Sequence, residues 1–451
     1  MLTRLLAKGV GPFENLDMDF SDGNGNPHLG PHIIAGVNGS GKSTALRSIG
    51  WCFARGKDVD FPAGIWKHLL RNERSAAQVF VKPASTVQSS FAAGMSVGPN
   101  KPILPKFLVP PDWRDSRGWR KVSSPGPEME RWLFGRSLFE KGEHRLCVGA
   151  YSPNLNLEYV EEERLAEKST ARFFVKRSLG FKTSVRNEVV QRWWLDLFAR
   201  EALSADPSLK ESLRRTRIRL EEAIRDMMDP SFRILTDTQH GLALMVELHG
   251  QRLNLSQIPD GVRTVLGWLA DFFRRRECVQ WDPALAQTRP SILLIDEIDT
   301  HLHPRWQRRI LRAIKKALPD VQIIVTTHSP FVITSCPGAR VHVLELDRFG
   351  NATARQPRDA PIGSSITATL RDIFDVDSRF DVETEDQLKR WNQLKRNEAA
   401  GTSTDLERAE LQTLTATLAG KNSELRAIVK SPPSLPEGFV KALLQDEPWS
   451  D

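Results

Sequence analysis

The stretch GVNGSGKS, from Gly36 to Ser43, decides the fold of this chain. It matches the pattern G-x-x-x-x-G-K-[ST] in full, and it lies between an apolar run, HIIAG, and a segment from Ser43 to Phe53 with helical character. A strand, a glycine-rich loop and a helix in this order cradle the phosphates of a nucleotide. These flanking segments argue against a chance glycine-rich turn. The stretch therefore predicts an α/β fold of the P-loop type.

The residue types of this loop suit a nucleoside triphosphate with Mg²⁺. Glycines let backbone N–H groups close around phosphates, and the N-terminus of the following helix adds partial positive charge. We expect Lys42 to contact the β- and γ-phosphates. We expect the Ser43 hydroxyl to be a ligand of Mg²⁺.

A second segment, ILLIDE from Ile292 to Glu297, supplies the acidic half of such a site. Asp296, at the carboxyl end of an apolar strand, can bind Mg²⁺ directly or through water. Glu297 can orient and deprotonate an attacking water. The alternative is a strand that merely ends in acidic residues at the surface. Adjacent carboxylates repel unless a cation lies beside them, and the phosphate loop upstream supplies a reason for one.

A third segment, VTTHSP, ends another apolar strand and places His328 there. Because this strand follows the acidic one along the chain, His328 can meet the γ-phosphate, and we interpret it as functional rather than structural. The apolar strands alternate with helical segments such as Pro304 to Ala317. That alternation predicts parallel strands buried between helix layers.

Weaker patterns predict the remaining elements. Alternation with a period of two indicates strands, and spacings of three and four indicate helices. Clusters of Pro, Gly and Ser indicate loops. The expected elements are strands at Leu2 to Ala7, Asn15 to Phe20 and Arg145 to Ser152, a loop-rich insertion at about 83–127, a short helical arm at 201–230, a hairpin sheet at Phe232 to Leu255, a helix at Val262 to Arg276 and a charged helical tail from Asp381.

The composition is that of an ordinary globular protein. The chain has 451 residues, 40% hydrophobic and 26% charged, with a net charge of +7 and a pI of about 9.3. No run of about 18 apolar residues occurs, so we expect no membrane contact, and Lys8 and Gly9 argue against a signal peptide. The four cysteines lie far apart, without a metal or disulfide pattern, so we expect a cytoplasmic protein. The modest positive charge permits binding to nucleic acid without requiring it.

The motifs GVNGSGKS, LLIDEID and TTHSP, in this order and at this separation, resemble ABC-type ATPase heads. The likeness is to the SMC/RecF/OLD-like branch rather than to transporters, whose coupling pattern is not recognisable in residues 52–150. VGAYSPN before the segment QRWWLDLFAR, and the motif x-D-G-V-R, resemble the ATPases of bacterial anti-phage systems. The Septu-type (PtuA-like) ATPase comes first, with the ATPases of retron-linked Septu modules and of the PARIS system as near alternatives. The resemblance covers roughly residues 1 to 380.

This resemblance implies an α/β ABC-type P-loop ATPase head with an antiparallel β lobe, a short helical arm and a C-terminal helical extension. The expected parts are the first part of the head at 1–200, the arm at 201–230, the second part of the head at 231–380 and a partner or oligomer contact at 381–451. The residues expected to hold ATP in the phosphate loop are Gly36, Asn38, Gly39, Ser40, Gly41, Lys42, Ser43 and Thr44.

The resemblance also assigns roles around Mg²⁺ and the γ-phosphate. Ser43 and Asp296 are the expected metal ligands, Glu297 the general base and His328 the switch histidine. Asp299 falls in the segment that lines the dimer interface. In such proteins two heads enclose two ATP molecules, and the signature motif of the opposite subunit closes each site. We therefore expect a homodimer or a higher homo-oligomer.

The stretch Ile258-Pro259-Asp260-Gly261 aligns with that signature motif, whose usual form is Leu-Ser-Gly-Gly or Ser-Asp-Gly. Asp260 and Gly261 are expected to face the partner's ATP. Pro259 stands where the serine belongs, so a hydroxyl contact to the γ-phosphate is lost. Proline is tolerated in the first turn of a helix, and the Gly261 N–H and helix dipole can still face a phosphate. The hydroxyl of Ser256 is a candidate replacement for the missing serine hydroxyl, but Ser256 is out of register with the serine position of the motif.

Two further assignments stay open. Gln78 and the region of Tyr151 are the candidates for the conserved glutamine that follows the phosphate loop in the family. A Toprim nuclease needs a Glu and a later D-x-D, which Glu345 and Asp375-Val-Asp377 imitate. However, about 70 residues then remain, too few for a further α/β domain with its own core.

Three functions are compatible with this sequence. The first is a slowly hydrolysing ATPase that senses infection and restrains a separate nuclease of the HNH or Toprim type. The second is an SMC/RecF-like DNA-repair ATPase that acts directly on DNA, which the clusters RRTRIR and RRR favour unless they are solvated helix faces. The third is a protein that binds ATP without turnover, which Pro259 favours and Glu297 opposes.

Overall fold

The computed structural model describes residues 1–53, 76–81, 106–108, 146–158, 182–237, 243–279, 281, 285–376 and 380–430. The chain divides into two compact units, Met1–Asp375 and Val376–Asp451. Except for a short strand, β5 (Lys106–Leu108), the loop-rich insertion predicted at 83–127 lies outside the described residues.

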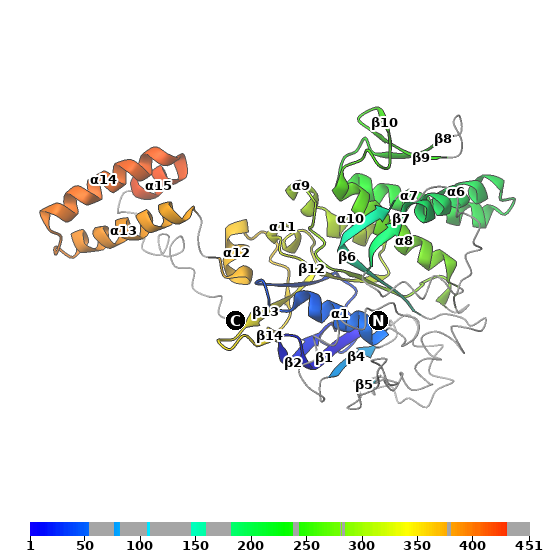
Figure 1. Ribbon diagram of the computed structural model, residues 1–451, viewed down its shortest axis with the longest axis horizontal. Coiled ribbons are helices and arrows are strands. Elements are labelled where there is room, and N and C mark those ends of the chain that lie inside the picture. The colour runs from blue at the N-terminus through cyan, green and yellow to red at the C-terminus, as the bar shows by residue number, and fades with distance from the viewer. Residues whose placement is uncertain are drawn as a thin grey trace. The chain divides into compact units, whose positions relative to one another are not determined.

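The first unit is built on a central sheet of mixed direction (Figure 1). Its order is β14-β13-β3-β12-β11-β6-β7, with β15 also paired to β13. All of these neighbours are parallel except β14 and β15, which run antiparallel to β13. The strands are β3 (His32–Gly36), β6 (Cys147–Glu158), β7 (Lys182–Arg186), β11 (Ser291–Ile295), β12 (Val321–Thr326), β13 (Arg340–Leu346), β14 (Ala352–Ala354) and β15 (Arg358–Asp359).

The central strands are apolar on both faces, as their uninterrupted apolar sequences predict. In β11, Leu293 and Ile295 belong to one hydrophobic cluster, whereas Ile292 and Leu294 belong to the other. All five residues of β11 are buried. The period of two thus supplies each layer with its own set of side chains.

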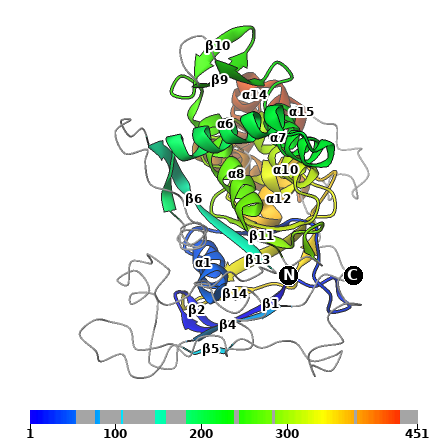
Figure 2. The same ribbon diagram turned by 90° about the vertical axis from the view of Figure 1, so that its right-hand side faces the viewer.

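Helices cover the first face (Figures 1 and 2). The buried side chains of α8, including Val262, Leu266 and Leu269, join those of α7 and α10 in this cluster. The helices of this face are α6 (Asn187–Leu203), α7 (Pro207–Met227), α8 (Asp260–Cys278) and α10 (Ile310–Ala317), with the short α9 (Pro304–Gln307), α11 (Pro330–Ile333) and α12 (Ile366–Phe374) beside them.

The second face is covered by one helix and an antiparallel sheet rather than by a full helix layer. Helix α1 (Lys42–Phe53) contributes Ala45, Leu46 and Ile49 to the second cluster. The sheet has the order β2-β1-β4-β5, with β1 (Leu2–Val10), β2 (Phe13–Asp19) and β4 (Ala76–Val81). The predicted helix layers are therefore correct for one face, and the predicted opening strands form the cover of the other.

Two predicted segments differ from the structure. The single helix expected at Pro304 to Ala317 is two helices, α9 and α10, because Arg308 and Arg309 form a turn between them. The helical arm is a hairpin of α6 and α7 whose second helix lies on the head. From Leu213 onward, α7 buries a stripe that includes Leu220 and Ile224 in the first cluster.

A small antiparallel sheet precedes α8, as predicted for residues 232–255. Its order is β10-β9-β8, with β8 (Arg233–Asp237), β9 (Ala243–Leu248) and β10 (Gln251–Asn254). The turn predicted at 249–250 joins β9 to β10, where His249 and Gly250 both have positive φ. The other predicted turn, at 240–241, lies outside the described residues.

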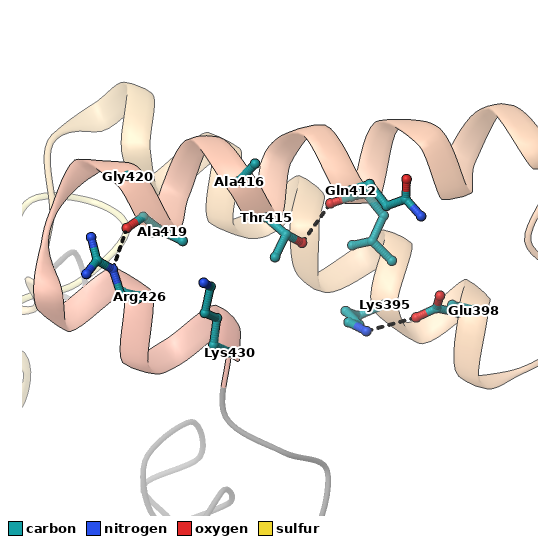
Figure 3. A pocket seen from close by; sticks show the side chains of 10 residues that line it. Lys395, Glu398, Gln412, Thr415, Ala416, Ala419, Gly420, Arg426 and Lys430 are labelled. Atoms are coloured by element: carbon teal, nitrogen blue, oxygen red, sulfur yellow. Dashed lines mark hydrogen bonds and ion pairs between the residues drawn. The ribbon is translucent and has the colours of Figure 1, made fainter.

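The second unit contains α13 (Val382–Ala399), α14 (Asp405–Lys421) and α15 (Ser423–Lys430). Leu388, Leu418 and Leu425 form its core. A groove of about 620 Å³ runs between these helices, and Figure 3 shows its lining, with ion-paired Lys395 and Glu398 on one side. This groove has no phosphate loop or carboxylate pair, so the nucleotide site must be sought in the first unit.

Candidate nucleotide-binding site

The phosphate loop joins β3 to α1 and is shaped by backbone that only glycine tolerates. Gly36 has a φ of 146°, and a Cβ there would lie 2.3 Å from the carbonyl oxygen of Leu344. Gly41 has a φ of 90°, and a Cβ there would lie 2.6 Å from the ring of Phe13. Side chains at either position would clash or strain the loop, so these glycines set its path.

Lys42 is directed into the loop. It is 5% exposed, and its Nζ donates to the carbonyls of Gly36 at 3.0 Å and Val37 at 2.9 Å. Burial lowers the pKa of Lys42 to about 8, against the opposing effect of nearby carboxylates, among them Glu297. A phosphate would offer this ammonium stronger acceptors than two carbonyls do.

Ser43 and Asp296, predicted to share a metal, are in direct contact. The Ser43 hydroxyl donates to Oδ1 of Asp296 at 2.8 Å, although 253 residues separate them in the chain. Asp296 is 1% exposed, and Thr326 Oγ1 donates to the same oxygen at 2.7 Å. Arg47 lies 3.3 Å from the other oxygen. The two halves of the predicted site therefore meet at one carboxylate.

Glu297 is held in a strained conformation at the end of β11. Its φ is 48°, which is uncommon for a residue other than glycine. Its N–H donates to Thr326 Oγ1 at 2.7 Å, and Thr300 donates to its Oε2 at 3.3 Å. Strained backbone persists where the surrounding structure holds it, often at functional sites.

Thr326 and Arg47 are site residues that the sequence reading missed. Thr326 donates to Asp296 and accepts from the backbone of Glu297, so one buried hydroxyl orients both acids. The sequence feature that could have indicated Thr326 is its position at the end of the apolar strand that precedes His328. Arg47, one turn after Ser43 on α1, had no motif to indicate it.

His328 lies at the end of β12 and is exposed. Its backbone N–H donates to Asp299 Oδ1 at 3.3 Å, and Thr327 donates to the same oxygen. Partial burial, and then the charge of Lys42, lower the pKa of His328 below its usual value. The ring is therefore close enough to Lys42 for the lysine charge to contribute to this shift.

The signature stretch begins α8. Pro259 is the N-cap residue, with φ of −53° and ψ of 141°, rather than a residue of the first turn as predicted. Its carbonyl accepts from the N–H groups of Val262 and Arg263, each at 3.0 Å. No side chain caps this helix. A cap has non-helical backbone angles, and proline meets that requirement while lacking a side-chain acceptor.

Asp260 and Gly261 make their described contacts outside the phosphate loop of their own chain. The Asp260 side chain is 72% exposed and pairs with Arg263. A Cβ on Gly261 would lie 2.4 Å from the carbonyl of His301, so the start of α8 packs against the segment that follows Glu297. Ser256 is exposed in the preceding turn. No hydrogen bond links Asp260 or Gly261 to residues 36–44 within the described chain.

The two candidates for the conserved glutamine differ. Gln78 lies in β4 opposite Leu6, and its side chain is outside the described residues. Tyr151 is 4% exposed and its hydroxyl donates to Asp271 at 3.0 Å, so it faces α8 rather than the phosphate loop. Neither supplies a described side chain to the phosphates.

The nuclease alternative has no metal cluster in the described part of the chain. Glu345 forms an ion pair with Arg355, and Asp375 ends α12 in the left-handed conformation. Asp377 lies outside the described residues.

The described residues fit a magnesium nucleotide. The Ser43 hydroxyl and the Asp296 carboxylate are oxygen ligands of the kind that Mg²⁺ prefers, and they are 2.8 Å apart. Ser40 Oγ is fully buried and has no hydrogen-bond partner among the described residues. A bound phosphate would supply that partner. Asn38, Gly39 and Thr44 border the same loop.

Two family models match the chain. One, described as "AAA domain, putative AbiEii toxin, Type IV TA system", matches residues 138–334, which include the acidic strand end and His328. Another, described as "AAA domain", matches residues 4–91, which include the phosphate loop.

Curated relatives have more specific names than these family models. "Retron Ec83 probable ATPase" of Escherichia coli is 25% identical over 423 residues, which are 81% of this chain and 74% of the relative. "Septu protein PtuA" of Bacillus thuringiensis is 34% identical over 94 residues, 20% of this chain and 24% of that protein. This chain is similar to the ATPases of Septu and retron anti-phage systems. The predicted resemblance is thereby confirmed.

A second retron relative and two solved structures are also similar to this chain. "Retron Vc95 probable ATPase" of Vibrio cholerae serotype O1 biovar El Tor is 29% identical over 165 residues, 36% of this chain and 31% of the relative. Among solved structures, an SMC head bound to the C-winged helix domain of ScpA aligns with 15% identity and a TM-score of 0.46, over 79% of this chain and 98% of that one. The SMC head domain from Thermotoga maritima aligns with a TM-score of 0.38 over the same shares.

The predicted absence of a spanning helix agrees with the described residues, where no helix combines the length and apolarity needed to cross a bilayer.

Proposed function

We propose that this protein is the ATPase subunit of an anti-phage complex, which binds ATP with Mg²⁺ and hydrolyses it slowly. Two copies close head to head around two ATP molecules. This closure controls a separate nuclease of the HNH or Toprim type. The observation that carries the proposal is the contact of the Ser43 hydroxyl with Asp296, beside a positioned Glu297.

Each polar side chain of the site has a separate role in the proposed hydrolysis. Lys42 exchanges its carbonyl acceptors, Gly36 and Val37, for phosphate oxygens. Ser43 and Asp296 would hold the Mg²⁺ ion, which would supply positive charge to the phosphate oxygens. Glu297 would accept a proton from the attacking water at its carboxylate. His328 lies on the same edge of the sheet and would donate a hydrogen bond towards the γ-phosphate.

Head-to-head closure is supported by the exposure of the signature end. Asp260 is exposed, and the close contact described for Gly261 is with His301 rather than with the phosphate loop. A second copy can therefore bring this helix start, with its partial positive charge, to the phosphates. Lacking a hydroxyl, Pro259 weakens that contact and favours slow turnover.

Control of a nuclease is supported by the relatives named as Septu and retron ATPases. Residues 381–451 are the proposed contact for that partner or for further copies. The described helices of this segment form a unit with its own core around Leu388 and Leu418. Co-purification of this protein with the product of the neighbouring gene tests this part of the proposal. A nuclease recovered in this way would support it.

The first test is phosphate release and sizing of the purified chain with and without Mg·ATP. We expect slow release, together with a larger species when ATP is present. Lys42→Ala, which cannot hold the phosphates, should show neither. No change in size on adding ATP to the wild type would contradict head-to-head closure, and no phosphate release would contradict hydrolysis.

Direct action on DNA has lost part of its support. Of the cluster RRR, Arg274 and Arg275 are buried against Asp271, and Arg276 bonds to Ser291 and to the carbonyl of Arg289. Two of these arginines are therefore buried, and the half-buried third is bonded within the chain. DNA binding that weakens with salt, with turnover raised by DNA, would restore this alternative.

A further inference from the structure

Tyr151 joins the acidic strand end to the signature helix. It lies in β6 directly opposite Ile295 of β11. Its carbonyl oxygen accepts from the N–H of Asp296 at 3.0 Å. Its hydroxyl donates to Oδ2 of Asp271 on α8 at 3.0 Å. One residue thus contacts the proposed metal ligand through its backbone and the signature helix through its side chain.

The acceptor of this hydroxyl is a buried carboxylate held by arginines. Asp271 is 2% exposed, and its oxygens accept from Arg274 and from Arg275, the latter at 2.6 Å. Burial by itself would raise the pKa of Asp271, but the two guanidinium groups outweigh it and lower the pKa to about 2. The carboxylate is therefore charged at neutral pH and is a strong acceptor for the phenol.

Such a cluster is costly to bury and stiff once its polar groups are satisfied. Removing one arginine would leave Asp271 with a single guanidinium partner, whereas removing the phenol hydroxyl leaves it with both arginines. The packing of core helices on a sheet does not by itself require this hydroxyl. The Tyr151 ring packs beside the Trp268 ring, with 6.3 Å between the two centroids, and phenylalanine would keep that contact.

The position of Asp271 along α8 makes the contact mechanically useful. Asp260 begins the helix, and Asp271 follows about three turns later, roughly 16 Å along the axis. Figures 1 and 2 both show α8 beside β6. The start of α8 also packs on His301. The helix is thus fixed to the acidic strand end near its start and in its middle.

We infer that Tyr151 is a positioning residue that holds the signature helix and the Asp296–Glu297 strand end in one geometry, so that closure of the head on a partner sets the acids for hydrolysis. The inference rests on the proposed function. Tyr151 is buried, and it acts through Asp271 and Asp296.

The test is Tyr151→Phe in the full chain, which removes one oxygen atom and keeps the ring. We expect phosphate release at saturating Mg·ATP to fall at least fivefold, while the Kd for ATP changes less than twofold. ATP-driven association should weaken as well. A merely structural role would lower stability without separating turnover from affinity.

Thr216→Val is the matched control. Thr216 on α7 is 8% exposed, and its hydroxyl donates at 3.3 Å to Glu277 on α8, the helix that also carries Asp271. This variant also deletes a hydroxyl that binds a carboxylate of α8, but the hydroxyl comes from α7 rather than from β6, and the carboxylate lies six residues after Asp271. We expect a similar loss of thermal stability and unchanged turnover.

The outcomes separate the two proposals. Turnover of Tyr151→Phe equal to that of Thr216→Val overturns the positioning role while leaving the ATPase proposal intact. A parallel loss of ATP affinity and turnover also overturns it, because the residue would then shape the binding loop. A wild-type chain that binds ATP without releasing phosphate overturns the hydrolysis proposal and, with it, this inference.

Discussion

The phosphate-loop end and the signature end of this ATPase head differ in how they are held. At the first, Asp296 is 1% exposed and accepts from Ser43 and Thr326. At the second, Pro259 and Asp260 are exposed, and no side chain caps α8. The phosphate-loop end is thus organised by contacts within one chain, whereas the end proposed to meet a partner's nucleotide is open at the surface.

This difference shows which contacts of the proposed nucleotide site one chain can make by itself and which need a second chain. The acids and the phosphate loop can be cross-linked by short hydrogen bonds because parallel strands bring their carboxyl ends to one edge. In the proposed dimer, the polar groups at the start of α8 bind the other subunit's nucleotide, so they cannot also be occupied by groups of their own chain. Substitutions at the phosphate-loop end should therefore abolish ATP binding or hydrolysis, and substitutions at the signature end should change the turnover rate moderately.

Lys42→Ala should have the largest effect. It removes the ammonium that now occupies the carbonyls of Gly36 and Val37. Loss of charge-assisted hydrogen bonds to phosphate costs several kcal/mol, so ATP should bind at least about 100-fold more weakly. Calorimetric titration with ATP measures this. Wild-type affinity in the variant would mean that Lys42 does not face the phosphates.

Glu297→Gln should separate binding from chemistry. The amide keeps the shape of the side chain but cannot take a proton, so turnover should fall by roughly 10² to 10⁴ while ATP is retained. The closed dimer should accumulate, visible as a larger species by sizing with ATP. Normal phosphate release from this variant would remove Glu297 from its role as base.

Pro259→Ser tests the open end and should have a moderate effect. A serine can cap α8 and offer its hydroxyl to a partner's phosphate, so turnover should rise by about two- to tenfold, consistent with the worth of one or two hydrogen bonds. Ser256→Ala is the control, since that residue is exposed in the turn before. Unchanged turnover would mean that the backbone of the helix start carries the contact.

A pH prediction separates the stability of the head from its nucleotide chemistry. His342 is fully buried in β13, 3.0 Å from the ring of His32, and burial lowers the pKa of His342 to about 3. The unfolded chain, with a histidine pKa near 6.5, therefore binds more protons than the folded chain between pH 6.5 and 3. Stability should fall as the pH drops through this window, by at most about 1.4 kcal/mol per unit for each such histidine.

The measurement is the melting temperature between pH 7.5 and 5. His342→Gln keeps a hydrogen-bonding group opposite His32 but does not titrate, so its melting temperature should fall less steeply below pH 6.5. Parallel curves for the variant and the wild type would show that His342 does not drive the acid sensitivity.

Much of this site could be predicted because its motifs are local. The order of Gly36, Gly39 and Gly41 before Lys42 fixes a backbone path that few other sequences allow. Asp296 and Glu297 follow an apolar run whose length and composition indicate a buried strand. Each of these predictions concerns a handful of neighbours in the chain.

The rest depended on contacts between distant segments. Thr326 and Arg47 carry no motif, and only the placement of β12 and α1 beside Asp296 makes them part of the site. The arginines of the cluster RRR resembled a surface patch, yet Asp271 draws two of them inside. Sequence spacing cannot indicate burial of this kind, because the countercharge and the covering layers come from the tertiary structure.

The sequence by itself determined the nucleotide chemistry of this protein. The loop around Lys42 and the acids after β11 are encoded by residue types that have few other uses in that order. Only the tertiary structure decided which groups orient them and what fixes α8. The physical reason is that glycine conformation and strand periodicity act over a few residues, whereas a hydrogen bond such as Tyr151 to Asp271 joins residues 120 positions apart.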